Sequence, residues 1–189
     1  MLSHGAGSNS QAPLLVALAE VFAGVGVTVL RCDLAFRQIR PYGPPRPGDG
    51  ARDRDGLKNA VAALRRLVSG RMSLGGHSYG GRQSTMLSAD VPDLVESLLL
   101  LSYPLHPPRK PEQLRVQHLP RLETPALFVQ GTRDPFASPE ELGSALSLIP
   151  ARTRLLRIEG AGHDLGFQGK LRPDELPALV LGEFQKFFA

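Results

Sequence analysis

The side chains best suited to chemistry in this chain of 189 residues are Ser78, Asp134 and His163, in that order. Each follows a short apolar run and is flanked by glycine or proline. A serine hydroxyl becomes an effective nucleophile when a base removes its proton. Imidazole can accept and return a proton near neutral pH, and a carboxylate can hold the imidazole in the required tautomer. The order therefore predicts a nucleophile, an orienting acid and a base.

The predicted nucleophile lies in the sequence Gly-His-Ser-Tyr-Gly, which runs from Gly76 to Gly80. A nucleophilic serine must stand clear of the backbone, and a sharp turn between a strand and a helix achieves this at the cost of crowding. The two glycines relieve that crowding because they have no β-carbon. An apolar run at 72–74 and a helical pattern at 79–89 flank the motif, a context that favours a catalytic turn over a structural glycine-rich one.

Two backbone amides are candidates for the oxyanion hole that an acyl-transfer reaction needs. One is the N–H of Tyr79, at the start of the helix after the serine. The other is the N–H of Ala6, in a His-Gly-Ala-Gly segment that begins at His4 and follows an expected early strand. A phosphate-binding role for this segment is excluded, because no Lys-Ser or Lys-Thr pair follows it. We expect His4 itself to be structural.

Short apolar runs alternate with helical patterns along the chain, which is typical of a parallel sheet covered by helices. Functional groups gather at the carboxyl ends of the strands of such a sheet. We therefore expect one three-layer α/β/α domain spanning residues 1–189, with a mainly parallel sheet that brings the three candidate side chains together. The expected strands are 27–30, 72–74, 97–102, 126–129 and 155–158, and the expected helices are 14–22, 57–68, 79–89, one that starts at Ser138, and 176–187.

Two loop regions bear on access to the site. Residues 35–50 are rich in proline and glycine and are expected to form a loop. Only about 20 residues separate the strands at 97–102 and 126–129, so we expect a minimal lid and an open site that suits small or extended soluble substrates. Loop side chains at the expected mouth could favour an anionic substrate, although we favour a solvated role for them. These side chains are Arg37, Arg40, Tyr42, Arg46 and His106.

Composition narrows the function classes further. The 22 basic and 18 acidic residues are interleaved and aromatic residues make up only 6%, which argues against nucleic-acid binding. No apolar run approaches the ~20 residues needed to cross a bilayer.

The single cysteine, Cys32, excludes an internal disulfide and is expected to be a buried structural thiol. The five histidines lack the spacing of metal ligands, so we expect no metal and no cofactor, and we expect a cytoplasmic protein because no secretion signal is visible.

With its serine motif, Asp134, His163 and the His-Gly segment, the chain resembles the α/β-hydrolase superfamily over almost its whole length. The resemblance is strongest to the small dienelactone-hydrolase-like branch. The segments 4–9, 75–81, 131–134 and 162–165 are similar to the group related to testis-expressed protein 30. The resemblance implies an α/β-hydrolase fold. It also implies a full strand before the His-Gly segment, where this sequence has only residues 1–3. We therefore expect N-terminal strands that are reduced or missing, with Met1 a downstream start or a truncation.

The leading hypothesis is hydrolysis of an ester, thioester or related acyl bond of a small soluble substrate through an acyl-Ser78 intermediate. Two alternatives stay open. One is a non-catalytic scaffold or binding module with the hydrolase fold, since a related domain occurs in a chromatin-complex subunit. The other is a peptidase that uses the same three side chains. The expected partner is a small acyl compound, with neither nucleic acid nor membrane, and a homodimer is left open.

Overall fold

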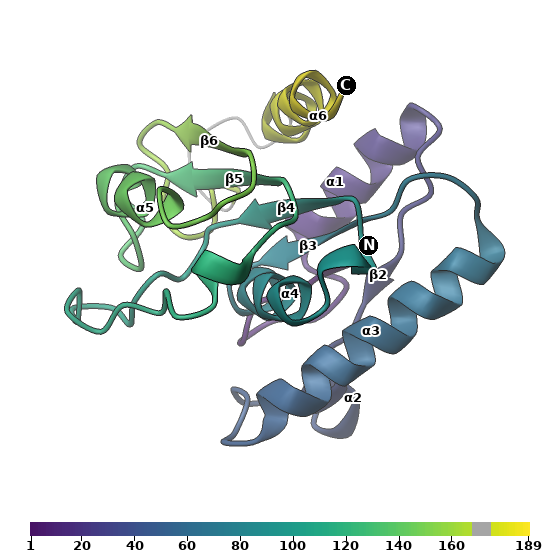
Figure 1. Ribbon diagram of the computed structural model, residues 1–189, viewed down its shortest axis with the longest axis horizontal. Helices are drawn as coiled ribbons and strands as arrows, with labels where there is room; N and C mark the ends of the chain where they lie inside the picture. The colour runs from purple at the N-terminus through teal and green to yellow at the C-terminus, as the bar shows by residue number, and fades with distance from the viewer. Residues whose placement is uncertain (168–174) are drawn as a thin grey trace.

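A six-stranded parallel sheet, in the order β2-β1-β3-β4-β5-β6, forms the middle layer of the molecule (Figure 1). The computed structural model describes residues 1–167 and 175–189. This architecture confirms the predicted three-layer α/β fold. The strands are β1 (Leu2–Ser3), β2 (Arg31–Cys32), β3 (Ser73–His77), β4 (Ser97–Leu101), β5 (Ala126–Gly131) and β6 (Thr153–Ile158).

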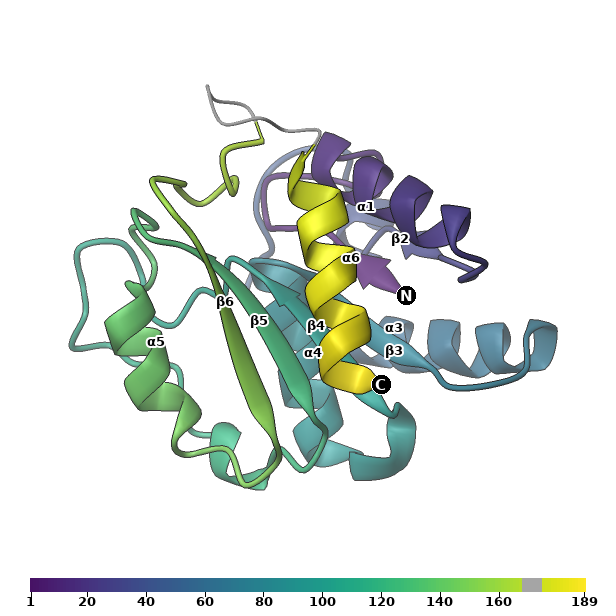
Figure 2. The same ribbon diagram turned by 90° about the horizontal axis from the view of Figure 1, so that it is seen from above.

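Helices cover both faces of the sheet. Two of them, α1 (Pro13–Gly24) and α6 (Glu175–Phe188), pack together on one face (Figure 2). The remaining helices lie on the opposite face, with α2 to α4 grouped below the sheet in Figure 1. They are α2 (Ala35–Ile39), α3 (Asp49–Leu67), α4 (Tyr79–Asp90) and α5 (Pro139–Leu146), and two short 3-10 turns lie at Pro92–Leu94 and Leu119–Arg121. No helix in the described part of the chain is both long and apolar enough to span a membrane.

Strand β4 shows why the central strands have continuous apolar sequences. Leu98 and Leu100 belong to the core beneath α3, α4 and α5, whereas Leu99 and Leu101 belong to the core beneath α1 and α6. Successive side chains of a strand point to opposite faces, so a sheet covered on both faces buries every residue of a central strand. The unbroken leucine run is thus the consequence of two cores, one on each side of the sheet.

The strand predicted at 27–30 is wrong. The paired residues are Arg31 and Cys32, while Val27 and Thr28 are exposed. The physical reason is the neighbouring strand: β1 consists only of Leu2 and Ser3, so the backbone before residue 30 has no strand beside it to complete a ladder. The expectation of a reduced N-terminal strand is confirmed, since this two-residue strand lies inside the sheet and pairs with both β2 and β3.

The loop predicted over residues 35–50 is also wrong in part. Residues 35–39 form the short helix α2, and α3 already begins at Asp49. A tertiary contact fixes α2, because Phe36 is fully buried and its N–H donates to Oδ1 of Asp53 at 2.9 Å. The prolines are confined to residues 41–47, within the segment 40–48 that lacks regular structure.

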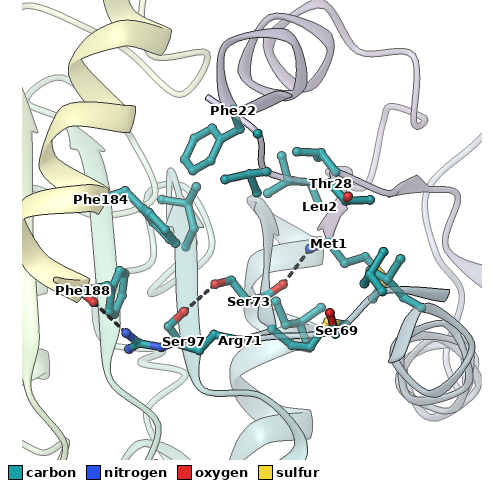
Figure 3. A pocket seen from close by; sticks show the side chains of 18 residues that line it. Met1, Leu2, Phe22, Thr28, Ser69, Arg71, Ser73, Ser97, Phe184 and Phe188 are labelled. Carbon is teal, nitrogen blue, oxygen red and sulfur yellow. Dashed lines mark hydrogen bonds between the residues drawn. The ribbon is translucent and has the colours of Figure 1, made fainter. Parts of the chain in front are cut away.

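A cavity of about 380 Å³ lies at the amino ends of β1 and β3, the opposite end of these strands from Ser78 (Figure 3). The terminal nitrogen of Met1 donates to the carbonyl oxygen of Ser73 at 2.6 Å, and Ser73 and Ser97 are joined through their hydroxyl groups at 2.5 Å (Figure 3). Burial lowers the pKa of the Met1 amine to about 6. Met1, Ser73 and Ser97 therefore satisfy one another's hydrogen-bonding groups at this end of the sheet.

Candidate active site

Ser78, Asp134 and His163 meet in one hydrogen-bonded line. Nε2 of His163 lies 2.8 Å from Oγ of Ser78, and Nδ1 of His163 lies 2.8 Å from Oδ2 of Asp134. A carboxylate only accepts, so Nδ1 carries the proton and Nε2 is free to accept from the serine hydroxyl. The three residues follow β3, β5 and β6, whose carboxyl ends open at one edge of the sheet. The structure thus brings together all three residues that the sequence singled out.

Asp134 also stabilises the turn around Pro135 with its own carboxylate. Its side chain is fully buried, and Oδ1 accepts from the N–H of Phe136 at 2.9 Å while Oδ2 faces His163. The two carboxylate oxygens therefore have different partners, one in the turn around Pro135 and one on the imidazole. This double engagement fixes the direction in which the carboxylate points.

Ser78 occupies a strained backbone conformation between β3 and α4. Its φ is 51° and its ψ is −117°, a region that residues with a β-carbon rarely adopt. The neighbouring chain is close: a β-carbon on Gly76 would collide with the carbonyl oxygen of Ser3, and one on Gly80 would lie 2.6 Å from the carbonyl oxygen of His4. Glycine is therefore required at both positions, as the motif predicted.

The predicted oxyanion donors, Ala6 and Tyr79, line the same cavity as Ser78. Neither backbone N–H is engaged by another residue in the described ranges 1–167 and 175–189. Tyr79 is the first residue of α4, where helical N–H groups have no partner within the helix. Two amides thus remain available beside the serine.

Buried groups hold the loop that carries Ala6. The His4 ring is buried, with Nδ1 donating to the carbonyl oxygen of Gly5 at 2.8 Å and Nε2 accepting from the N–H of Leu34 at 3.0 Å. The guanidinium of Arg37 donates to the carbonyl oxygen of Ala6 at 3.0 Å and to that of Ser8 at 2.8 Å. His4 therefore has a structural role here.

The cavity next to Ser78 has a volume of about 600 Å³. The only regular structure between β4 and β5 is the short turn at Leu119–Arg121, so this segment contributes no helical cap and the predicted minimal lid is confirmed. The lining described by the structure contains no aspartate or glutamate. It consists of Gly5, Ala6, Gly7, Ser8, Pro44, Pro45, His77, Ser78, Tyr79, Arg82, Pro104, Arg115, Phe136 and His163.

The sequence model described as "Alpha/beta hydrolase domain" matches residues 1–175. The chain belongs to the alpha/beta hydrolase family. The fold is shared with a dienelactone hydrolase from Anabaena variabilis (TM-score 0.74, 23% identity, covering 99% of this chain and 83% of that one). It is shared equally with an alpha-beta serine hydrolase homologue from Coxiella burnetii (TM-score 0.75, 20% identity, 96% and 83% covered).

A third structural neighbour is Est1E from Butyrivibrio proteoclasticus with ferulic acid bound (TM-score 0.75, 16% identity, 98% of this chain and 87% of that one covered). These likenesses extend over nearly the whole of this alpha/beta hydrolase. The narrower grouping with testis-expressed protein 30 stays a prediction.

Two of the five side chains expected to be solvated at the site mouth are buried instead. Arg37 points inward to the backbone carbonyls described above, and His106 contacts the carbonyl oxygen of Pro107 and the carboxylate of Glu141. The prediction was wrong because a high proline and glycine content indicates a loop but does not show which of its side chains point into the domain. Of the other three, Arg40 pairs with Asp49 at 2.6 Å, and Tyr42 and Arg46 are exposed. None of the five lines the cavity.

Sequence reasoning missed two aromatic neighbours of the His163 imidazole. Nε2 of His77 donates to the backbone carbonyl oxygen of His163 at 2.8 Å, and burial lowers the pKa of His77 to about 4, so its ring is neutral. The ring of Phe136 lies 4.2 Å from the His163 ring between centroids, tilted by 35°. His77 stood inside the serine motif, but nothing in the motif indicates that its ring reaches a loop after β6.

Cys32 is half-buried, and burial raises the pKa of its thiol to about 11. The thiol is therefore protonated near neutral pH and unsuited to nucleophilic attack. Among the described residues, no three histidine, cysteine, aspartate or glutamate side chains cluster in a way that could hold a metal ion.

Proposed function

We propose that this alpha/beta hydrolase cleaves an ester, thioester or related acyl bond of a small soluble substrate through an acyl-Ser78 intermediate. The observation that carries the proposal is the hydrogen-bonded line from Asp134 through His163 to Ser78, with the serine in a strained turn. A structural turn gains nothing from holding a hydroxyl in this conformation against an imidazole. Such strain concentrates at sites where the geometry serves a reaction.

In the proposed reaction Oγ of Ser78 attacks the acyl carbon while Nε2 of His163 takes the hydroxyl proton. The N–H groups of Ala6 and Tyr79 stabilise the negative charge on the former carbonyl oxygen. The bond to the leaving group then breaks, and His163 returns the proton to that group. Asp134 stabilises the transient imidazolium. Water repeats the sequence on the acyl-serine, with His163 as base, and releases the acid.

The cavity supports a small substrate. A volume of about 600 Å³ accommodates a compound of metabolite size. The segment between β4 and β5 contains only the turn at Leu119–Arg121, so it supplies no helical cap with the deep apolar channel that a long acyl chain needs. Short acyl groups and compact leaving groups fit this opening best.

Labelling with a fluorophosphonate probe tests the proposal. We expect the folded protein to be labelled, with loss of labelling in Ser78→Ala. Ser144→Ala, which changes an exposed serine of α5, serves as the matched control and should label like the wild type. Turnover of 4-nitrophenyl acetate and butyrate should follow the same pattern.

A panel of aminoacyl amides run beside the esters separates the proposal from a peptidase that uses the same residues. Cleavage of amides in preference to esters would replace it with the peptidase. Folded wild-type protein that is neither labelled nor active on either panel would contradict the enzyme and favour the non-catalytic scaffold.

A further inference from the structure

Two arginines line the cavity together with Ser78. Arg82 lies on α4, and its backbone N–H donates to the carbonyl oxygen of Ser78 at 3.0 Å, so it stands one helical turn after the serine. Arg115 comes from the segment between β4 and β5 and reaches the same cavity. Both are half-buried. Two positive side chains from separate parts of the chain thus converge beside the proposed nucleophile.

Nothing in the described part of the protein balances these charges. Neither guanidinium forms an ion pair with a described residue, and the cavity lining holds no carboxylate. Nε of Arg82 is buried without a hydrogen-bond partner. The side chain of Arg115 has one long contact, 3.4 Å to the carbonyl oxygen of Pro104. Two unpaired positive charges beside a cavity without a carboxylate are costly, which points to a negatively charged partner that is not part of the chain.

Other arginines of the protein show the contrast. Arg40 pairs with Asp49 at 2.6 Å and Arg65 pairs with Glu96 at 3.0 Å, while Arg37 is buried against backbone carbonyls. Arg82 and Arg115 instead repel one another: burial and then the charge of Arg82 lower the pKa of Arg115.

The nearby His118 offers no compensation. Burial, and then the charge of Arg82, lower its pKa to about 4, so the ring is neutral at pH 7. Its Nε2 is already engaged by the hydroxyl groups of Thr85 and Tyr103. The two arginines therefore form a cationic site open to an anion.

We infer that Arg82 and Arg115 bind an anionic group of the substrate, so that the acyl compound cleaved at Ser78 carries a carboxylate or a comparable oxyanion. The inference rests on the function proposed above. Guanidinium groups suit this role because their N–H donors match the planar geometry of a carboxylate, and a charged hydrogen bond is stronger than a neutral one. The anion would relieve the mutual repulsion of the arginines.

Two esters of equal chain length and leaving group test this inference, 4-nitrophenyl valerate and 4-nitrophenyl hemiglutarate. They differ only in the terminal carboxylate. We expect wild-type kcat/KM to favour the hemiglutarate by about tenfold or more. The valerate ester of 5-hydroxy-2-nitrobenzoate places the carboxylate on the leaving group, so comparing it with 4-nitrophenyl valerate shows which side of the scissile bond the arginines bind. Preference for either anionic ester over the neutral one supports the inference.

Arg82→Gln and Arg115→Gln should each bring the ratio of anionic to neutral kcat/KM down towards one. Arg66→Gln removes the same charge from an exposed position on α3 and should leave the ratio unchanged. The ratio can also be tested on the wild type alone, where the result does not depend on whether a variant folds. Raising the salt concentration from about 50 to about 500 mM should lower the ratio, because salt screens the attraction between the arginines and the carboxylate.

The outcomes separate the inference from the function on which it rests. Turnover of the neutral ester with no preference for either anionic ester overturns the inference and leaves the hydrolase proposal standing. A preference that survives both arginine variants as fully as it survives Arg66→Gln also overturns it. Absence of turnover of all three esters by folded protein overturns both.

Discussion

The backbone carbonyl oxygen of His163 accepts a hydrogen bond from Nε2 of His77 at 2.8 Å, which ties the loop after β6 to the serine motif. The two residues are 86 positions apart, and their ring centroids lie 5.0 Å from one another. His77 therefore positions the imidazole that contacts Ser78 without touching the serine hydroxyl through its own ring nitrogens.

We expect His77→Leu to lower kcat by about tenfold to a hundredfold, because a small displacement of a catalytic base has effects of that size. His77→Gln keeps an N–H donor at comparable reach and should recover part of the loss. KM should change less than kcat in both variants. Steady-state kinetics on a short-chain 4-nitrophenyl ester checks this, and equal activity of His77→Leu and wild type would contradict a positioning role.

The same histidine makes stability depend on pH. Burial lowers the pKa of His77 from 6.5 to about 4, so the unfolded chain binds a proton between these values and the folded protein does not. The free energy of unfolding should therefore be at its full value above pH 6.5 and fall as the pH drops towards 4, with His77 contributing about 3 kcal/mol. His118, whose pKa is also lowered to about 4, acts in the same direction.

Urea unfolding at pH 7, 5.5 and 4.5 measures this loss. His77→Gln has no ionisable ring, so its free energy of unfolding should fall less steeply over the same range. An equally steep fall in the variant would show that other groups are responsible for the pH dependence.

Parts of the site were predictable because their signals are local. Ser78, Asp134 and His163 each lie at or shortly after the carboxyl end of a strand, and the parallel order of the strands brings these ends together. The continuous leucine run of β4 likewise predicts a strand that is buried on both faces of the sheet. Such features need only the pattern of one segment and the general geometry of a parallel sheet.

Other features depend on contacts between distant segments. The apolar run at 27–30 forms no strand because its neighbour β1 is only two residues long, which the run itself does not reveal. Helix α2 depends on Asp53 accepting from the N–H of Phe36. Arg82 and Arg115 become neighbours only once α4 and the segment after β4 are placed, so their convergence has no signature in the sequence.

Arg37 offers a test of how the oxyanion loop is held. Its guanidinium donates to the carbonyl oxygens of Ala6, Ser8 and Gly43. Arg37→Met keeps the length of the side chain and removes these bonds, so it should destabilise the protein by about 2 kcal/mol. It should also lower kcat, because the N–H of Ala6 loses its fixed direction.

The matched control for this change is Arg46→Met, at an exposed position in the neighbouring loop. It should leave both the free energy of unfolding and kcat unchanged. Urea unfolding together with steady-state kinetics distinguishes the two variants. A normal kcat in Arg37→Met would mean that the loop keeps its conformation without the guanidinium.

Two glycine-to-alanine substitutions separate crowding at the serine turn from the general effect of a methyl group. A β-carbon on Gly80 would lie 2.5 Å from Oγ of Ser3 and 2.6 Å from the carbonyl oxygen of His4, whereas one on Gly143 meets nothing within 4 Å. Gly80→Ala must push β1 or the loop after it away from α4, and we expect a loss of about 2 kcal/mol or more in the free energy of unfolding. Gly143→Ala lies inside α5 and should instead stabilise the protein by about 0.5–1 kcal/mol, since alanine favours a helix over glycine. Urea unfolding of both variants gives the comparison, and a Gly80→Ala protein as stable as the wild type would show that the backbone around Ser78 can yield.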